Sequence, residues 1–80
     1  MHKMADSQVM SFNEISMEYP ENYIVVEVSN INHSVGIEEG KAVYLCDSYE
    51  MAWDKAGTIT NVRTVVLEGI NRMSTVGVVL

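Results

Sequence analysis

The central part of the fold is encoded in residues 41–68, which read KAVYLCDSYEMAWDKAGTITNVRTVVLE. Residues 42–46 and 62–68 are rich in β-branched and aromatic side chains, and they predict two strands. Residues 47–56 lie between them and predict a helix. A strand–helix–strand unit of this length has enough connecting chain to run its two strands parallel.

The predicted helix has a recognisable start, apolar stripe and end. Asp47 is an N-cap residue type and Glu50 follows three positions later, as in a capping box. Gly57 is expected to end the helix in the left-handed conformation. The residues at i, i+3, i+4 and i+7 that should face the core are Tyr49, Ala52, Trp53 and Ala56. We interpret Trp53 as the core anchor of this helix rather than as a ligand-stacking residue.

Length and composition indicate one globular domain, residues 1–80, with residues 1–8 disordered. Hydrophobic residues make up 48% of the 80 residues and charged residues 20%, which is typical of a folded chain. The single cysteine, Cys46, excludes an internal disulfide and fits a reducing compartment, so we expect a cytoplasmic protein. No apolar run approaches the roughly 18 residues of a membrane-spanning helix, so no membrane partner is expected.

The charge balance argues against nucleic acid as a partner. Eleven acidic residues against five basic ones give a formal net charge of −6. Affinity for nucleic acid depends largely on Lys and Arg side chains that neutralise phosphates. The basic residues here are few and scattered, so they form no basic stripe.

A short N-terminal helix is predicted from residue 11 to about residue 18. Ser11 and Glu14 have the spacing of a capping box, and Met10 can pack on Ile15 as a hydrophobic staple. Pro20 disfavours helical geometry in the residue before it, which ends the helix. At about two turns, this helix needs to pack on the sheet or its edge.

Residues 23–29, YIVVEVS, form the strongest predicted strand. Alternation places Ile24, Val26 and Val28 on one face, which we expect to meet the helix at 47–56. Residues 30–40 contain turn residues and predict a wide hairpin loop, or strands that continue through it, with antiparallel pairing on either side. The sheet order is either a split unit with the 23–29 strand in the middle or a simple sequential order.

These elements define an α+β fold: a three- to four-stranded antiparallel or mixed sheet, one main helix on one face, and a short N-terminal helix. Both faces of the strands are apolar, and one helix covers only one face. Residues 76–80, VGVVL, are a β-prone apolar run that we expect to pair within the sheet or with a second copy. The candidate interface residues are Tyr23, Val25, Tyr44, Val66, Val76, Val78 and Leu80.

Two short motifs resemble those of very short bacterial α-β-β-α-β domains of uncharacterised function. One is YPENY at residues 19–23, which leads into the first strand, and the other is DSYEMA at residues 47–52. The strand–strand–helix–strand core is also similar in topology to HicB-type antitoxins, which bind a toxin nuclease as dimers. This chain departs from them because it lacks their DNA-binding segment. The resemblance implies no catalytic residue.

A reactive centre is the alternative reading. Cys46 falls where a strand meets a helix N-terminus, a position that lowers the pKa of a thiol. His33 and Tyr44 could join it in a small-molecule or enzymatic site. However, a lone cysteine at a strand end is usually a small buried side chain, and no metal-ligand spacing or phosphate-binding loop is present.

We therefore expect a non-enzymatic protein-interaction module without metal or cofactor. Its partner is a second copy, through a sheet face or the 76–80 strand, or another protein.

Overall fold

Two long strands joined by a tight turn form the centre of the structure, a computed structural model that describes residues 2–3 and 8–72. Strands β3 (Tyr23–Asn32) and β4 (Ile37–Cys46) pair antiparallel over ten residues each. In the turn, Gly36 has a φ of 73°, which glycine adopts without strain. The antiparallel hairpin is confirmed, and of the two alternatives the strands continue through most of residues 30–40.

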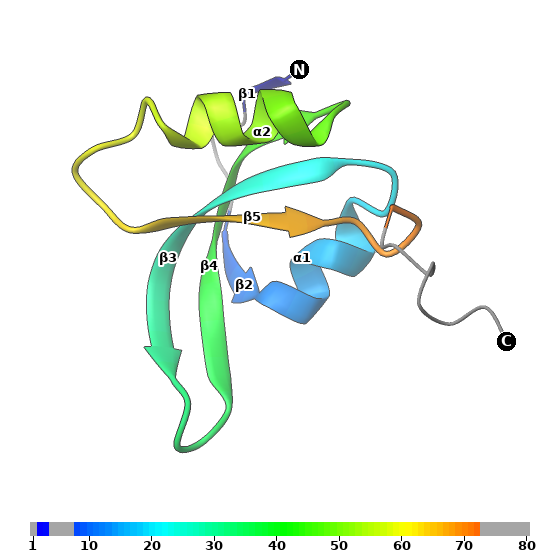
Figure 1. The fold of residues 1–80 in the computed structure, drawn as a ribbon. Helices are drawn as coiled ribbons and strands as arrows, with labels where there is room; N and C mark the ends of the chain where they lie inside the picture. The colour runs from blue at the N-terminus through cyan, green and yellow to red at the C-terminus, as the bar shows by residue number, and fades with distance from the viewer. Residues whose placement is uncertain (1, 4–7, 73–80) are drawn as a thin grey trace, which may run out of the picture.

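The sheet has the split order with β3 in the middle. Strand β5 (Thr64–Glu68) pairs antiparallel with β3 on the side away from β4, so β4 and β5 run parallel to each other. Strands β1 (His2–Lys3) and β2 (Val9–Ser11) both pair antiparallel with β4, giving the order β1-β4-β3-β5 with β2 beside β4 (Figure 1). His2–Lys3 thus form a strand inside the segment expected to be disordered.

Helix α1 (Phe12–Glu18) begins and ends as its sequence predicts. The Ser11 hydroxyl accepts from the Glu14 N–H at 3.1 Å, and the Glu14 carboxylate accepts from the Ser11 N–H at 3.2 Å. This reciprocal pair satisfies two N–H groups that the first turn leaves without helical partners. The capping box is therefore confirmed, and α1 ends two residues before Pro20.

Helix α2 (Tyr49–Ala56) ends at Ala56 as predicted, but its N-cap residue and the conformation of its C-cap differ from the prediction. Its N-cap is Ser48, whose hydroxyl accepts from the Met51 N–H at 3.2 Å, so the assignment to Asp47 is wrong by one residue. Gly57 is right-handed, with φ −66° and ψ −18°, where a left-handed residue was expected. The Thr58 and Ile59 N–H groups bond three residues back, so the helix ends in tightening turns that need no left-handed residue.

The face of α2 that meets the sheet is made of alanines. Ala52 is 0% exposed and Ala56 is 6% exposed, whereas Trp53 is 51% exposed. The prediction that Trp53 anchors the core is therefore wrong. Small side chains at i and i+4 let the helix lie close to the strands, and a residue next to Ala52 is turned about 100° away from that contact.

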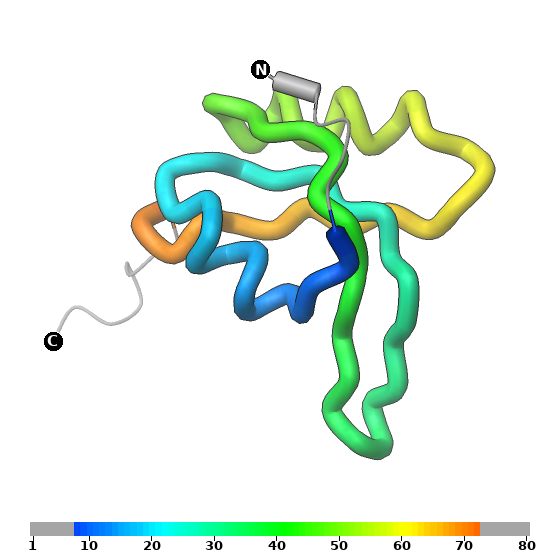
Figure 2. The backbone as a smooth tube through the Cα atoms, turned by 180° about the vertical axis from the view of Figure 1, so that it is seen from behind, coloured from blue at the N-terminus to red at the C-terminus, as the bar shows by residue number. Residues whose placement is uncertain are grey.

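Each face of the sheet is covered by a different helix (Figure 1, Figure 2). One core contains the buried residues Ile15, Ile24, Val26 and Ala42, with α1 packed on them. The other contains Val25, Cys46, Ala52 and Ala56, beneath α2. The predicted contact of the Ile24 face with α2 is therefore wrong, because α1 occupies that face and the Val25 face meets α2.

A β-bulge in β4 explains which side chains share a face. Val25 pairs with Tyr44 and Val26 with Ala42, so Val43 is an extra residue on β4. Both Val43 and Tyr44 consequently pack against the α2 core. The predicted strict alternation along residues 42–46 is wrong at this point.

Candidate protein-interaction edge

The outer edge of β5, the edge turned away from β3, carries backbone groups that β3 cannot reach. The Val28 N–H donates to the Arg63 carbonyl at 2.9 Å, and the Gly69 N–H donates to the Asn22 carbonyl at 2.7 Å. Every second residue of an antiparallel strand bonds to the same neighbour. Thr64, Val66 and Glu68 therefore direct their N–H and C=O groups to the outer edge.

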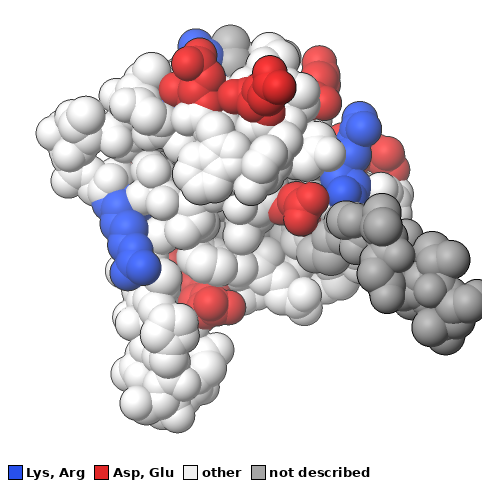
Figure 3. Space-filling model, viewed as in Figure 1, with Lys and Arg blue, Asp and Glu red and all other residues white. Residues whose placement is uncertain are grey.

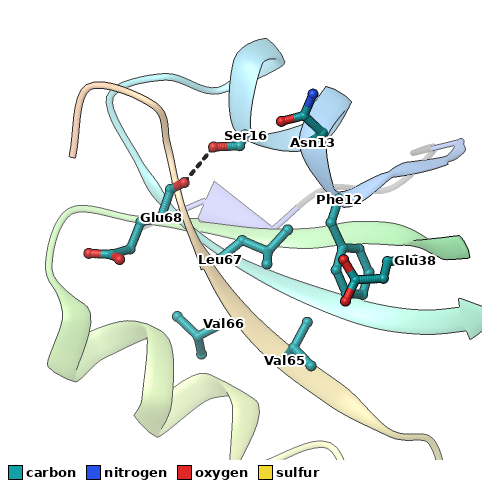
Figure 4. Close-up of a pocket in the computed structure, with 8 residues that line it drawn as sticks. All are labelled: Phe12, Asn13, Ser16, Glu38, Val65, Val66, Leu67 and Glu68. Carbon is teal, nitrogen blue, oxygen red and sulfur yellow. Dashed lines mark hydrogen bonds between the residues drawn. The ribbon is translucent and has the colours of Figure 1, made fainter. Parts of the chain in front are cut away.

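One end of this edge is closed by a side chain of α1. The Ser16 hydroxyl, 4% exposed, donates to the Glu68 carbonyl at 2.6 Å (Figure 4). Within the described residues, the outward N–H and C=O groups of Thr64 and Val66 have no hydrogen-bond partner. A strand that pairs here would satisfy four backbone groups on these two residues.

A groove of about 700 Å³ borders the outer edge of β5 (Figure 4). It touches residues 65–68, whose side chains alternate between the two faces, so it includes the strand edge as well as one face. Phe12 and Leu67 give it an apolar lining, and both also pack on the core under α1. The remaining lining residues are Asn13, Ser16, Val65, Val66, Glu38 and Glu68.

The described residues that were predicted to form an interface pack under α2, and Val66 among them also borders the groove. Val25 is 0% exposed, and Tyr23, Tyr44 and Val66 are partly buried against the same core. This is the face expected to be bare, and it is covered because α2 packs there. Val76, Val78 and Leu80 fall outside the described residues.

The structure does not bring the alternative reactive groups together. His33 lies exposed in the turn between β3 and β4, whereas Cys46 is buried at the other end of β4. The nine residue steps from Ile37 to Cys46 span roughly 30 Å. Tyr44 is near Cys46 in the α2 core, but His33 cannot reach either side chain.

Cys46 is in an environment that keeps its thiol neutral. Burial raises the pKa of Cys46 above its ordinary value, Asp47 adds to the rise, and the charge of Lys55 opposes it. Since the thiolate is the nucleophile, a raised pKa and full burial both lower reactivity. The expected activation at a helix N-terminus is not what the structure shows.

We expect the Cys46 thiol to react with an aromatic disulfide reagent at least about 100-fold more slowly in the folded protein than in urea at the same pH. The absorbance of the released thiolate measures both rates. Equal rates would contradict the burial of Cys46.

The raised pKa of Cys46 also predicts a pH dependence of stability. Because the folded pKa is raised, the thiol contributes stability at pH values below its ordinary pKa of 9.0, and that stability falls as the pH rises above 9.0. Cys46→Ala should remove this part of the pH dependence.

Among the described residues, no helix is long and apolar enough to cross a membrane. No group of three or more His, Cys, Asp or Glu side chains in residues 8–72 is placed to hold a metal ion.

Comparisons with protein-family models, with curated proteins and with solved structures gave no match. The class of protein is thus defined by the fold and the edge alone: a small α+β domain with a split β-α-β arrangement and an outer strand that borders an apolar groove. The resemblance to very short bacterial domains stays a prediction.

Proposed function

We propose that this chain is a homodimeric protein-interaction module in which the outer edge of β5 binds residues 76–80 of a second copy as an added strand. The observation that carries the proposal is the set of outward backbone groups on Thr64 and Val66 beside the groove. Strand addition uses this pairing for affinity and side-chain pockets for specificity. The proposed role is non-enzymatic. The proposed location is the cytoplasm, as expected from the single cysteine.

The sequence of residues 76–80 fits the edge in length and in pattern. The run VGVVL has five residues, the same number as β5. In an extended strand Val76, Val78 and Leu80 point to one side. That side would face the lining of Phe12 and Leu67 in the groove.

The path of the chain after β5 favours a second copy over the same chain. The Ile70 N–H donates to the Ser16 carbonyl at 3.0 Å and the Asn71 N–H to the Pro20 carbonyl at 2.9 Å. The Arg72 side chain donates to the Glu21 carbonyl at 2.7 Å. Residues 69–72 are therefore held against residues 16–22, beyond the Glu68 end of β5, and not alongside Thr64 and Val66 of its outer edge. If each of two copies adds its residues 76–80 to β5 of the other copy, one symmetric interface pairs the outer β5 edges of both copies.

Val78→Asp is expected to convert a dimer into a monomer, because it places a charge in the strand that pairs with β5 without changing the described fold. Light scattering coupled to size exclusion, at about 150 mM salt to screen the acidic surfaces, should give twice 8.9 kDa for the unmodified chain and 8.9 kDa for the variant. Thr64→Pro should act similarly, since its N–H points outward and the pairing with β3 is kept.

Val35→Asp is the matched control, because Val35 is 66% exposed in the turn between β3 and β4 and lines no part of the groove. It should remain dimeric. A monomeric unmodified chain at micromolar concentration would overturn the proposal. A Val78→Asp protein that stays as dimeric as the control would do so as well.

A further inference from the structure

A row of aromatic side chains runs from the sheet onto the exposed side of α2. The ring centroids of Tyr23 and Tyr49 are 5.7 Å apart, and those of Tyr49 and Trp53 are 5.9 Å apart, both in edge-to-face geometry. Tyr49 is 48% exposed and Trp53 is 51% exposed. About half of the surface of each of these residues is therefore left in contact with water, where it contributes little to folding.

Cations of this chain already lie over tyrosine rings near this row. The Arg72 guanidinium is 5.8 Å from the Tyr23 ring centroid, and the Lys55 ammonium is 5.6 Å from that of Tyr44. Among the described residues no cation lies over Trp53, although an indole attracts cations more strongly than a phenol does. The row thus ends on its best cation-binding ring.

Two exposed carboxylates lie beside the row. Glu50 and Asp54 are four residues apart, like Tyr49 and Trp53, so the acidic pair forms a second row next to the aromatic one. Figure 3 shows acidic side chains gathered over α2, next to uncharged surface. An exposed indole flanked by carboxylates is complementary to a guanidinium, which stacks on one and donates to the other.

We infer that the face of α2 formed by Tyr49, Glu50, Trp53 and Asp54, the α2 outer face, binds an arginine-containing basic segment of a partner protein. A second copy is disfavoured there because it would bring these carboxylates against acidic groups of a chain with net charge −6. Phosphate groups are disfavoured for the same reason. This inference concerns a surface other than the outer edge of β5 and does not depend on the dimer.

The binding can be followed without a label, because Trp53 is the only tryptophan of the chain. Titration with a peptide of eight arginines should shift its emission with a dissociation constant of about 10–100 µM in about 20 mM salt, weakening several-fold at about 150 mM. A peptide of eight lysines should bind several-fold more weakly, because an ammonium does not stack as a planar guanidinium does. A peptide of eight glutamates should not bind.

The variant Glu50→Gln/Asp54→Asn should weaken binding about tenfold. Its matched control is Glu14→Gln/Glu18→Gln on α1, which removes two carboxylates of the same spacing, and glutamine keeps the capping box. The control should bind within about twofold of the unmodified chain. Trp53→Leu, followed by calorimetry, should lose most of the affinity.

Equal weakening by the two double variants would overturn the inference, because net charge alone would then explain binding. Equal affinity for the lysine and arginine peptides would overturn the guanidinium assignment. Absence of saturable binding would overturn the whole inference. Repeating the titration with Val78→Asp separates this result from the dimer, since the α2 outer face is unchanged in that variant.

Discussion

Replacing Ile15 by alanine is expected to lower the free energy of unfolding by about 3 kcal/mol. Ile15 is 0% exposed, and it is the apolar residue that α1 buries in the core with Ile24 and Val26. The substitution removes three carbons from this core and leaves a cavity. A chain of 80 residues has a total stability of roughly 4–12 kcal/mol, so the loss is a large part of it. Denaturation by urea, followed by circular dichroism, measures the change.

Met17→Ala is the control on the same helix. Met17 is 52% exposed, and alanine favours the helical conformation, so the free energy of unfolding should change by less than about 0.5 kcal/mol. The comparison tests whether α1 covers its face of the sheet. Equal losses in the two variants would mean that α1 does not hold this face.

The local elements of the fold could be predicted because their signals are local. The capping box at Ser11 and Glu14 places the start of α1, and Pro20 places its end. The strand at residues 23–29 and its antiparallel pairing with the strand at 42–46 followed from β-branched residues and the turn residues between them. The structure confirms each of these predictions.

The partner of each sheet face could not be predicted from alternation. A period of two shows that Ile24 and Val26 share a face and that Val25 lies on the other. It does not show which helix covers either face, because that depends on the path of the chain between elements. Val43, the extra residue of the bulge, then shifts the alternation along β4.

The exposure of Trp53 could not be predicted from the spacing of apolar residues along α2 either. The stripe of Tyr49, Ala52, Trp53 and Ala56 spans an arc of about 100°, and the contact with the sheet can be centred on its large or on its small residues. The structure buries the alanines, and the aromatic rings remain half exposed. The two readings differ in the distance between helix and sheet, which sequence spacing does not specify.

Only part of the candidate interaction edge could be predicted from the sequence. Composition alone predicts that residues 76–80 form a strand in need of a partner, and these residues lie outside the described part of the chain. The outer position of β5 depends on the split order, which the sequence left open. Which of its backbone groups point outward depends on the register with β3, and the closure at Glu68 depends on Ser16, 52 residues away in the chain.

Replacing Gly69 by alanine is expected to lower the free energy of unfolding by about 3 kcal/mol or more. Gly69 is buried directly after β5, and a Cβ atom there would lie 2.5 Å from the carbonyl carbon and oxygen of Pro20 and would also meet the Tyr19 carbonyl oxygen. These atoms are backbone, so they cannot move aside as the end of a side chain can. Relief requires residues 69–72 to separate from residues 16–22, which also breaks the bond from the Gly69 N–H to the Asn22 carbonyl.

Gly57→Ala is the matched control and should have the opposite sign. Gly57 has a right-handed conformation, and the nearest atoms to an added Cβ are 3.5 Å and 3.6 Å away, which is ordinary contact. Alanine there reduces the conformational freedom of the unfolded chain and should stabilise the protein by about 0.4–1 kcal/mol. Measuring Gly69→Ala in the Gly57→Ala background keeps more of the variant folded for the urea titration.

The path of residues 69–72 also supports the proposed exchange of strands between two copies. The Gly69→Ala measurement therefore tests the proposed function as well. If Gly69→Ala, like Gly57→Ala, does not lower the free energy of unfolding, residues 69–72 do not approach Tyr19 and Pro20 closely. The chain would then be free to turn back onto the outer edge of β5, and pairing within one copy would be as good as pairing between two. A loss of about 3 kcal/mol instead supports the close approach that directs the chain away from that edge.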